Sequence, residues 1–172
     1  MDSVIDYCDQ TDVNFRSFAF DDPRDHGFRW VDLKRFRLRA EPPADELVLR
    51  ALMGDDHFAD GYSGGGPNPA GGIHGPYRLA RIASDSYEHV DAEAAIDEVD
   101  GWARQYGRLP ASLAEALEEQ VYAPIRKASG LFRLKDLGEA AFHDFVVHGE
   151  FHELVLIDRA TNALTLVVAG DD

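Results

Sequence analysis

Histidines and carboxylates gather in the segment FHDFVVHGEFHE, residues 142–153, which holds three of the seven histidines of the chain. If residues 139–148 form a helix, Asp144 and His148 lie four residues apart on one face. A carboxylate in that place can fix the tautomer of an imidazole and raise its basicity. The segment therefore predicts an acid–base site whose candidate catalytic residues are His148, Asp144 and His152.

The same segment has a purely structural interpretation. It can be a helix-to-strand junction closed by Gly149, in which His148 stabilises the helix C-terminus. His143 and His148 are five residues apart and would point in different directions around a helix, and no HExxH motif is present. A metal ion would need a distant ligand such as His57 or His74, so we predict no metal and no cofactor.

A serine-hydrolase pattern occurs at Gly61-Tyr62-Ser63-Gly64-Gly65. A nucleophile elbow requires a buried strand before the serine and a helix after it. Here MGDDHFAD precedes the serine and GPNPAGG follows the pattern, and neither suits those elements. We therefore predict a Gly/Pro-rich loop over residues 61–76 and no nucleophilic role for Ser63. Tyr62 and His74 are the aromatic groups of this region that could contact a ligand or partner.

A run of acids without any lysine or arginine covers residues 85–100. Such a run is typical of a solvated helix face, where the first acids also complement the helix dipole. It is equally a candidate docking surface for a basic protein, and its seven acids are Asp85, Glu88, Asp91, Glu93, Asp97, Glu98 and Asp100. A row of basic residues, Arg35, Arg37 and Arg39, should pair with acids across a sheet.

The bulk composition limits the classes of function. The chain has 172 residues, 45% hydrophobic and 28% charged, which is enough for one globular domain. A single cysteine excludes an internal disulfide, and the apolar runs are too short for a membrane span. The formal net charge of −15 disfavours nucleic acid and anionic membranes and favours a basic protein partner. With no secretory signal, we expect a cytoplasmic protein.

Periodicity predicts a single α+β domain over residues 1–172. Its sheet is mainly antiparallel, with N-terminal strands and a C-terminal hairpin, and two or three helices lie between. We expect strands at 13–20, 33–40 and 77–84, and a hairpin of residues 151–158 and 163–169. We expect helices at 44–54, at 91–106 and from about Ser112, the last ended or kinked by Pro124.

Two functions remain open at this level. GRLPASLAEAL, residues 107–117, resembles the Leu-Pro helix start of small bacterial immunity-type domains, but only over these residues, and no site residue is transferred from it. The first function is an acidic protein-interaction module, such as a toxin-neutralising or regulatory partner protein. The alternative is a small enzyme with a His/carboxylate acid–base site between the 61–76 loop and the 142–153 cluster.

Overall fold

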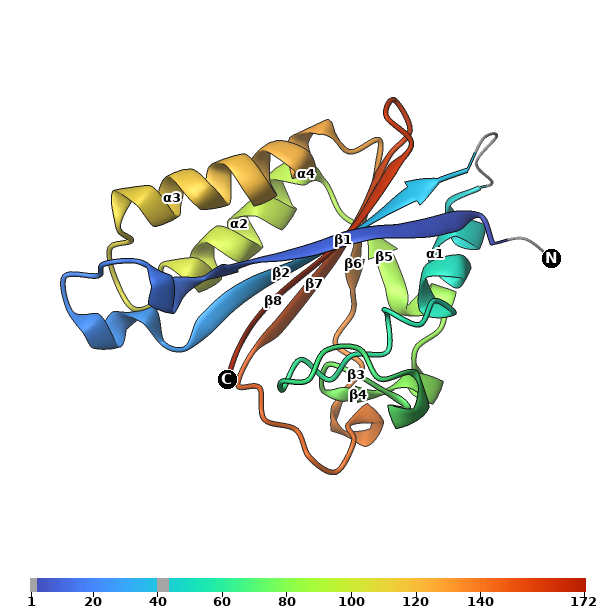
Figure 1. Cartoon of the computed structure of the whole chain (residues 1–172), viewed down its shortest axis with the longest axis horizontal. Helices are drawn as coiled ribbons and strands as arrows, with labels where there is room; N and C mark the ends of the chain where they lie inside the picture. Colours follow the sequence, from blue (N-terminus) through green and yellow to red (C-terminus); the bar gives the residue numbers. More distant parts are fainter. Residues whose placement is uncertain (1–2, 40–43) are drawn as a thin grey trace.

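Six antiparallel strands form the central sheet of the computed structural model, which describes residues 3–39 and 44–172. Their order across the sheet is β1-β2-β8-β7-β6-β5 (Figure 1). The strands are Ile5–Asn14 (β1), Arg29–Leu38 (β2), Tyr87–His89 (β5), Gly130–Leu134 (β6), Phe151–Asp158 (β7) and Ala163–Asp171 (β8). The N-terminal β1–β2 pair thus joins the C-terminal β7–β8 hairpin at the centre, which confirms the predicted α+β fold and hairpin.

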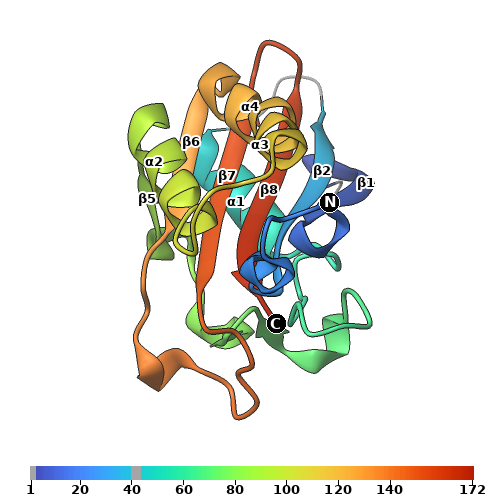
Figure 2. The same ribbon diagram turned by 90° about the vertical axis from the view of Figure 1, so that its left-hand side faces the viewer.

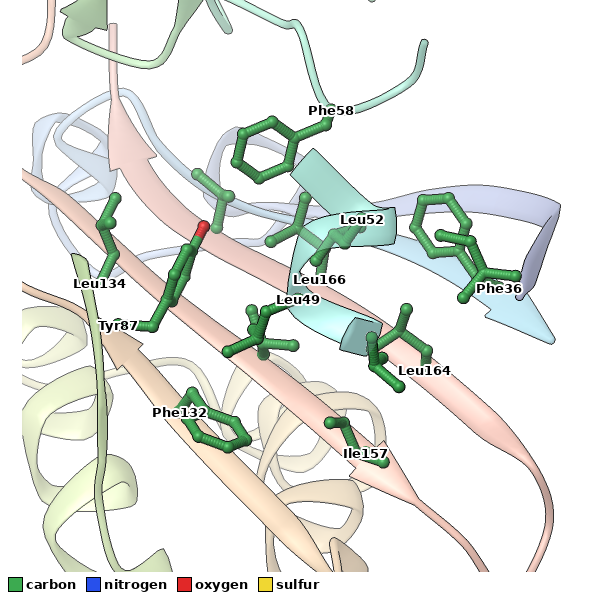
Figure 3. Packing of buried hydrophobic residues seen from close by; sticks show 14 of the residues in the cluster. Phe36, Leu49, Leu52, Phe58, Tyr87, Phe132, Leu134, Ile157, Leu164 and Leu166 are labelled. Carbon is green, nitrogen blue, oxygen red and sulfur yellow. The ribbon is translucent and has the colours of Figure 1, made fainter. Parts of the chain in front are cut away.

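Both faces of the sheet are covered. Helices α2 (Ala92–Ala103), α3 (Ala111–Leu117) and α4 (Ala123–Lys127) pack on one face, and α1 (Asp45–Met53) lies on the other with the glycine-rich region (Figure 1). Side chains alternate between the faces of a strand. Val155 of β7 therefore joins the core under α1, whereas Leu154 joins the core under α2. Figure 3 shows the first of these cores, in which α1 packs against the sheet.

The helices follow their apolar patterns closely. α1 and α2 lie within the predicted ranges, and α3 begins at Ala111. A π-helical turn, Glu118–Tyr122, links α3 to α4. Proline lacks an N–H and its ring clashes with the carbonyl four residues earlier, so the widened turn accommodates Pro124 without ending the helix.

Two predicted strands are misplaced. The strand expected at 13–20 is instead β1, which ends at Asn14 and is followed by the 3-10 turn Phe15–Ser17. β1 is an edge strand with mostly exposed side chains, so its sequence lacks the alternation that marks a half-buried strand. The strand expected at 77–84 is limited to Tyr77–Arg78 (β4), which pairs with Ile73–His74 (β3). β2 is longer than predicted at its start, and Ala40 lies outside the described residues.

The glycine-rich region is a loop, as predicted, and it is tightly packed on the sheet. Its residues before β3 form bends and a 3-10 turn, with neither a strand before Ser63 nor a helix after it. Gly75 has a φ of 53°, and a Cβ atom there would lie 2.4 Å from the ring of Phe151. Only glycine permits this contact between the loop and β7.

The connection between β6 and β7 contains no long helix. Residues Glu139–Ala141 form one 3-10 turn, and the chain from 142 to 150 runs in turns and extended segments beyond the end of the sheet (Figure 2). The prediction of a helix at residues 139–148 is therefore wrong. Phe145 is 82% exposed and Val147 54% exposed, so the apolar residues there do not form the buried stripe that a helix would need.

Candidate functional site

The predicted Asp144–His148 pair is not formed. Without the helix, Asp144 points outward and forms an exposed ion pair with Arg78 at 3.1 Å. His148 instead bonds to two backbone carbonyl oxygens, at 2.8 Å from Gly61 and 2.7 Å from Asp171. A carbonyl oxygen only accepts hydrogen bonds, so each ring nitrogen of His148 faces an acceptor. In this arrangement His148 clamps the glycine-rich loop to the C-terminal strand, and both of its ring nitrogens are occupied by backbone contacts.

His152 lies between two carboxylates. Its Nδ1 is 3.6 Å from Glu98 and its Nε2 is 3.3 Å from Glu150. Burial lowers the pKa of His152, but the hydrogen bonds and charges of Glu98 and Glu150 outweigh burial and raise it overall. The hydrogen bond from His152 in turn lowers the pKa of Glu98, although burial opposes it. The two carboxylates thus favour the imidazolium form of His152, which can donate a proton but has no lone pair to accept one.

A hollow of about 640 Å³ lies beside this histidine. We call it the histidine hollow, and it is lined by polar and aromatic side chains that include Glu98, Arg133, Phe142, His148, Phe151 and His152. Arg133 binds Glu88 at 2.8 Å and Glu98 at 3.4 Å. The charged groups around Arg133 and His152 thus satisfy one another. Of the glycine-rich region only Pro76, at its end, borders the hollow, so the predicted pocket is built mainly by the 142–153 segment.

A buried triad lies beneath the histidine hollow. His74 stacks on Phe58 with ring centroids 3.7 Å apart, and its two nitrogens contact the Phe58 carbonyl and the Glu153 carboxylate. Tyr87 donates its hydroxyl hydrogen to the other oxygen of Glu153 (Figure 3 shows Tyr87 and Phe58 in this core). Burial and the Glu153 charge raise the pKa of Tyr87 well above its usual range, so the phenol stays protonated. This network joins the loop to β5 and β7 and is closed to solvent.

A second polar cluster lies at the β1–β2 edge, under the glycine-rich loop. Lys34 is fully buried, and its Nζ donates to Asp60 and to the hydroxyl of Tyr62, both at 2.8 Å. Tyr62 adopts a φ of 54°, unusual for a bulky residue, and its amide donates to Asp60 at 2.8 Å. The buried lysine therefore fixes the start of the loop against the sheet.

Another hollow, of about 430 Å³, opens beside this cluster. We call it the aspartate hollow, and it is lined by Gln10, Thr11, Asp12, Asn14, Trp30, Asp32, Asp60, Tyr62, Gly64 and Gly66. The Asp32 side chain is only 9% exposed. Its Oδ1 accepts from the Gln10 amide at 2.6 Å, whereas its buried Oδ2 has no hydrogen-bond partner among the described residues. Lys34 Nζ lies 3.6 Å from that oxygen.

The charge of Asp32 is incompletely compensated. Burial raises the pKa of the Asp32 carboxyl, and the charge of Lys34 and the hydrogen bond from Gln10 offset burial only in part. Asp12 lies directly opposite Asp32 in the β1–β2 ladder. Like charges opposite one another in a sheet are destabilising. Nothing in the sequence pattern separates Asp32 from the many other aspartates, so sequence reasoning missed it.

The acids of the 85–100 run have divided roles. Glu88 and Glu98 bind Arg133, and Asp100 binds Arg104 and the Tyr122 hydroxyl. Asp91 caps α2 by accepting from the amide of Ala94 at 2.7 Å. The remaining acids, Asp85, Glu93 and Asp97, are exposed. Two of the three arginines in the predicted basic row pair across the sheet, Arg35 with Asp9 and Arg39 with Asp6.

Comparison with known protein families, with curated proteins and with solved structures gives no match. Among residues 3–39 and 44–172 no group of three or more His, Cys, Asp or Glu side chains is arranged to hold a metal ion. Within the same ranges, no helix has the length and apolar character that crossing a bilayer requires. The fold and its sites thus define an acidic α+β protein with a covered antiparallel sheet and two polar hollows.

Proposed function

We propose that the protein is an acidic interaction module that binds a basic protein in the cytoplasm, in a toxin-neutralising or regulatory role. The observation that carries the proposal is the use of the basic side chains. Most of them form ion pairs within the chain, and the buried Arg29 donates to the backbone carbonyls of His26 and Trp102. Each internal pair consumes one acid and one base, so the excess charge of −15 stays uncompensated.

The exposed acids of the 85–100 run support the same function, with Glu93 and Asp97 on α2 and Asp85 in the 3-10 turn Ser84–Ser86 that precedes β5. Asp85, Glu93 and Asp97 are exposed and have no neighbouring base within the run. Exposed acids of this kind accelerate the encounter with a basic surface and exclude acidic partners such as nucleic acid. The proposal therefore gives these three acids the role of steering the partner.

The enzyme remains the alternative, because the histidine hollow is lined by both predicted histidines. His148 binds two carbonyls and His152 two carboxylates, so neither offers a free nitrogen for proton abstraction in this conformation. Replacing either histidine by alanine should leave partner binding intact. An activity lost in His152→Ala with an unchanged fold would instead favour the enzyme.

The decisive experiment identifies the partner and then measures its binding. The protein is isolated with its partner from cells that produce it, and the partner is identified by mass spectrometry. Association rates are compared between wild type and the variant Asp85→Asn/Glu93→Gln/Asp97→Asn. We expect a basic partner, a tenfold or greater loss of association rate in the variant, and a steep decrease with salt.

A matched control removes three exposed acids elsewhere, in Asp21→Asn/Asp56→Asn/Glu139→Gln. The control should change the association rate less than threefold, since general charge has a smaller effect than local steering. An acidic or neutral partner, or equal effects of the two variants, would contradict the proposal.

A further inference from the structure

The aspartate hollow is one positive charge short. Asp32 and Asp60 are both buried, and the single ammonium group of Lys34 serves them both. Burial raises the pKa of Tyr62 well above its usual range, so its phenol stays protonated and adds neither a positive nor a negative charge. Asp12 adds a further carboxylate on the same side of the ladder. A buried carboxylate without a counterion is costly, which points to a cation that completes the cluster.

Gln10 marks where this cation would bind. Gln10 is exposed on the edge strand β1. Its Nε2 donates a hydrogen bond to Asp32 Oδ1 over a distance of 2.6 Å. The Gln10 amide is neutral, and Asp32 Oδ2 accepts no hydrogen bond among the described residues, with Lys34 Nζ 3.6 Å away. A guanidinium group presents two parallel N–H donors to a carboxylate, so one such group could satisfy both oxygens after Gln10 rotates away.

The walls of the hollow suit a flat organic cation. The rings of Trp30 and Tyr62 lie 5.6 Å apart and 16° from parallel, and both line the hollow. Aromatic faces attract guanidinium groups. Gly64 and Gly66 face open space at the rim, which leaves an entrance. The described part of the chain forms no cluster suited to a metal ion, so an organic cation fits the donors better than a metal does.

We infer that the aspartate hollow binds a guanidinium group, held by Asp32 and flanked by Trp30 and Tyr62. The group can come from an arginine side chain of a polypeptide or from a free guanidino compound. This binding site is distinct from the acidic surface of α2, which covers the opposite face of the sheet (Figure 1). The inference goes beyond the proposed function and does not depend on it.

The test is a titration followed by ¹⁵N NMR. The probes are acetyl-Gly-Arg-Gly-amide, the same peptide with citrulline in place of arginine, and agmatine. The indole N–H signal of Trp30 reports on the hollow, and that of Trp102, which is buried on the other sheet face, is the internal reference. We expect saturable shifts at Trp30 and at the amides of Gly64 and Gly66 with arginine. The citrulline peptide should bind at least tenfold more weakly.

Variants separate the site from general charge. Asp32→Asn should weaken binding of the arginine peptide at least tenfold, whereas Asp56→Asn, which removes an exposed acid outside the hollow, should change it less than twofold. Gln10→Ala, which uncovers Asp32, should bind at least as tightly as wild type. Thermal melting verifies that each variant is folded. Tighter binding of the peptide than of agmatine indicates a polypeptide source, and the reverse indicates a free compound.

Equal responses to arginine and citrulline, or unchanged binding in Asp32→Asn, would overturn the inference. Its failure is distinguishable from failure of the proposed function. A basic partner that binds wild type and Asp32→Asn equally, together with equal responses to the arginine and citrulline peptides, leaves the proposed function standing and overturns the inference. If the arginine peptide binds the hollow but no basic protein partner is found, the inference stands and the proposed function fails.

Discussion

The histidine hollow and the aspartate hollow differ in how completely their charges are matched. Around the histidine hollow, His152 lies between Glu98 and Glu150, and Arg133 bridges two acids. In the aspartate hollow, one oxygen of Asp32 has no hydrogen-bond partner in the described parts of the chain. Buried polar groups in folded proteins are almost always satisfied, so an exception calls for an explanation. The comparison suggests that matched clusters hold this fold together and that the unmatched one serves a ligand.

The largest effect should come from breaking the matched triad below the histidine hollow. Glu153→Ala leaves the Nε2 atom of His74 and the Tyr87 hydroxyl buried without a partner, and we expect a loss of about 3 kcal/mol or more in the free energy of unfolding. Glu153→Gln keeps an acceptor for Tyr87 and should lose less. Urea denaturation monitored by circular dichroism gives both values. A loss below about 1 kcal/mol in Glu153→Ala would show that the triad is not structural.

Removing the buried ammonium group of Lys34 tests how strongly the carboxylates of the aspartate hollow depend on it. Lys34→Met leaves Asp60 and Asp32 without an ammonium group and should destabilise the protein by about 3 kcal/mol at pH 7. Adding Asp60→Asn to Lys34→Met removes one uncompensated charge and should recover part of that loss. The measurement is a double-mutant cycle by chemical denaturation. Additive effects would mean that Lys34 and Asp60 do not interact.

The contribution of His152 to the free energy of unfolding should depend on pH. Because its folded pKa is raised, its contribution to stability is complete below the unfolded value of about 6.5 and is lost as pH rises through the folded pKa. His152→Gln should therefore cost about 1 kcal/mol more at pH 6 than at pH 9. His89→Gln, an exposed histidine of β5, is the matched control. Stability curves of wild type and His152→Gln that stay parallel across this range would contradict the raised pKa.

The smallest effect on stability should come from Asp32→Asn. A carboxyl whose folded pKa is raised above its unfolded value of about 3.9 makes the folded state less favourable as pH rises through that interval. At pH 7 the asparagine variant should therefore equal or exceed wild type, by about 1 kcal/mol at most, and the gain should vanish near pH 3. A clear loss of stability at pH 7 would show that Asp32 is a structural partner of Lys34.

Local patterns predicted the elements better than the sites. The apolar stripe of α2 and the branched residues of β7 and β8 are strong signals, and all three elements were found. β1 was misplaced because an exposed edge strand lacks alternation. A helix over residues 139–148 would have placed Asp144 and His148 on one face, but the structure has only the 3-10 turn Glu139–Ala141 within that range.

The buried polar groups could not have been found from local sequence. Lys34 lies in a strand whose neighbouring arginines pair at the surface, and Glu153 begins the otherwise apolar segment ELVLI. Their partners, Asp60 and His74, belong to the glycine-rich region, which reaches them only through the tertiary fold. A single charge in a buried strand is the one signal that a sequence offers for such a network.

The most direct test of the unmatched charge is the titration of the Asp32 carboxyl carbon by ¹³C NMR, with and without acetyl-Gly-Arg-Gly-amide. We predict that the pKa of Asp32 lies above the usual aspartate range in the free protein, because burial outweighs the charge of Lys34. Saturation with the arginine peptide should lower this pKa, because the carboxylate gains a cationic partner. The citrulline peptide should leave it unchanged. An Asp32 pKa that is already depressed in the free protein, or that arginine does not move, would contradict the account.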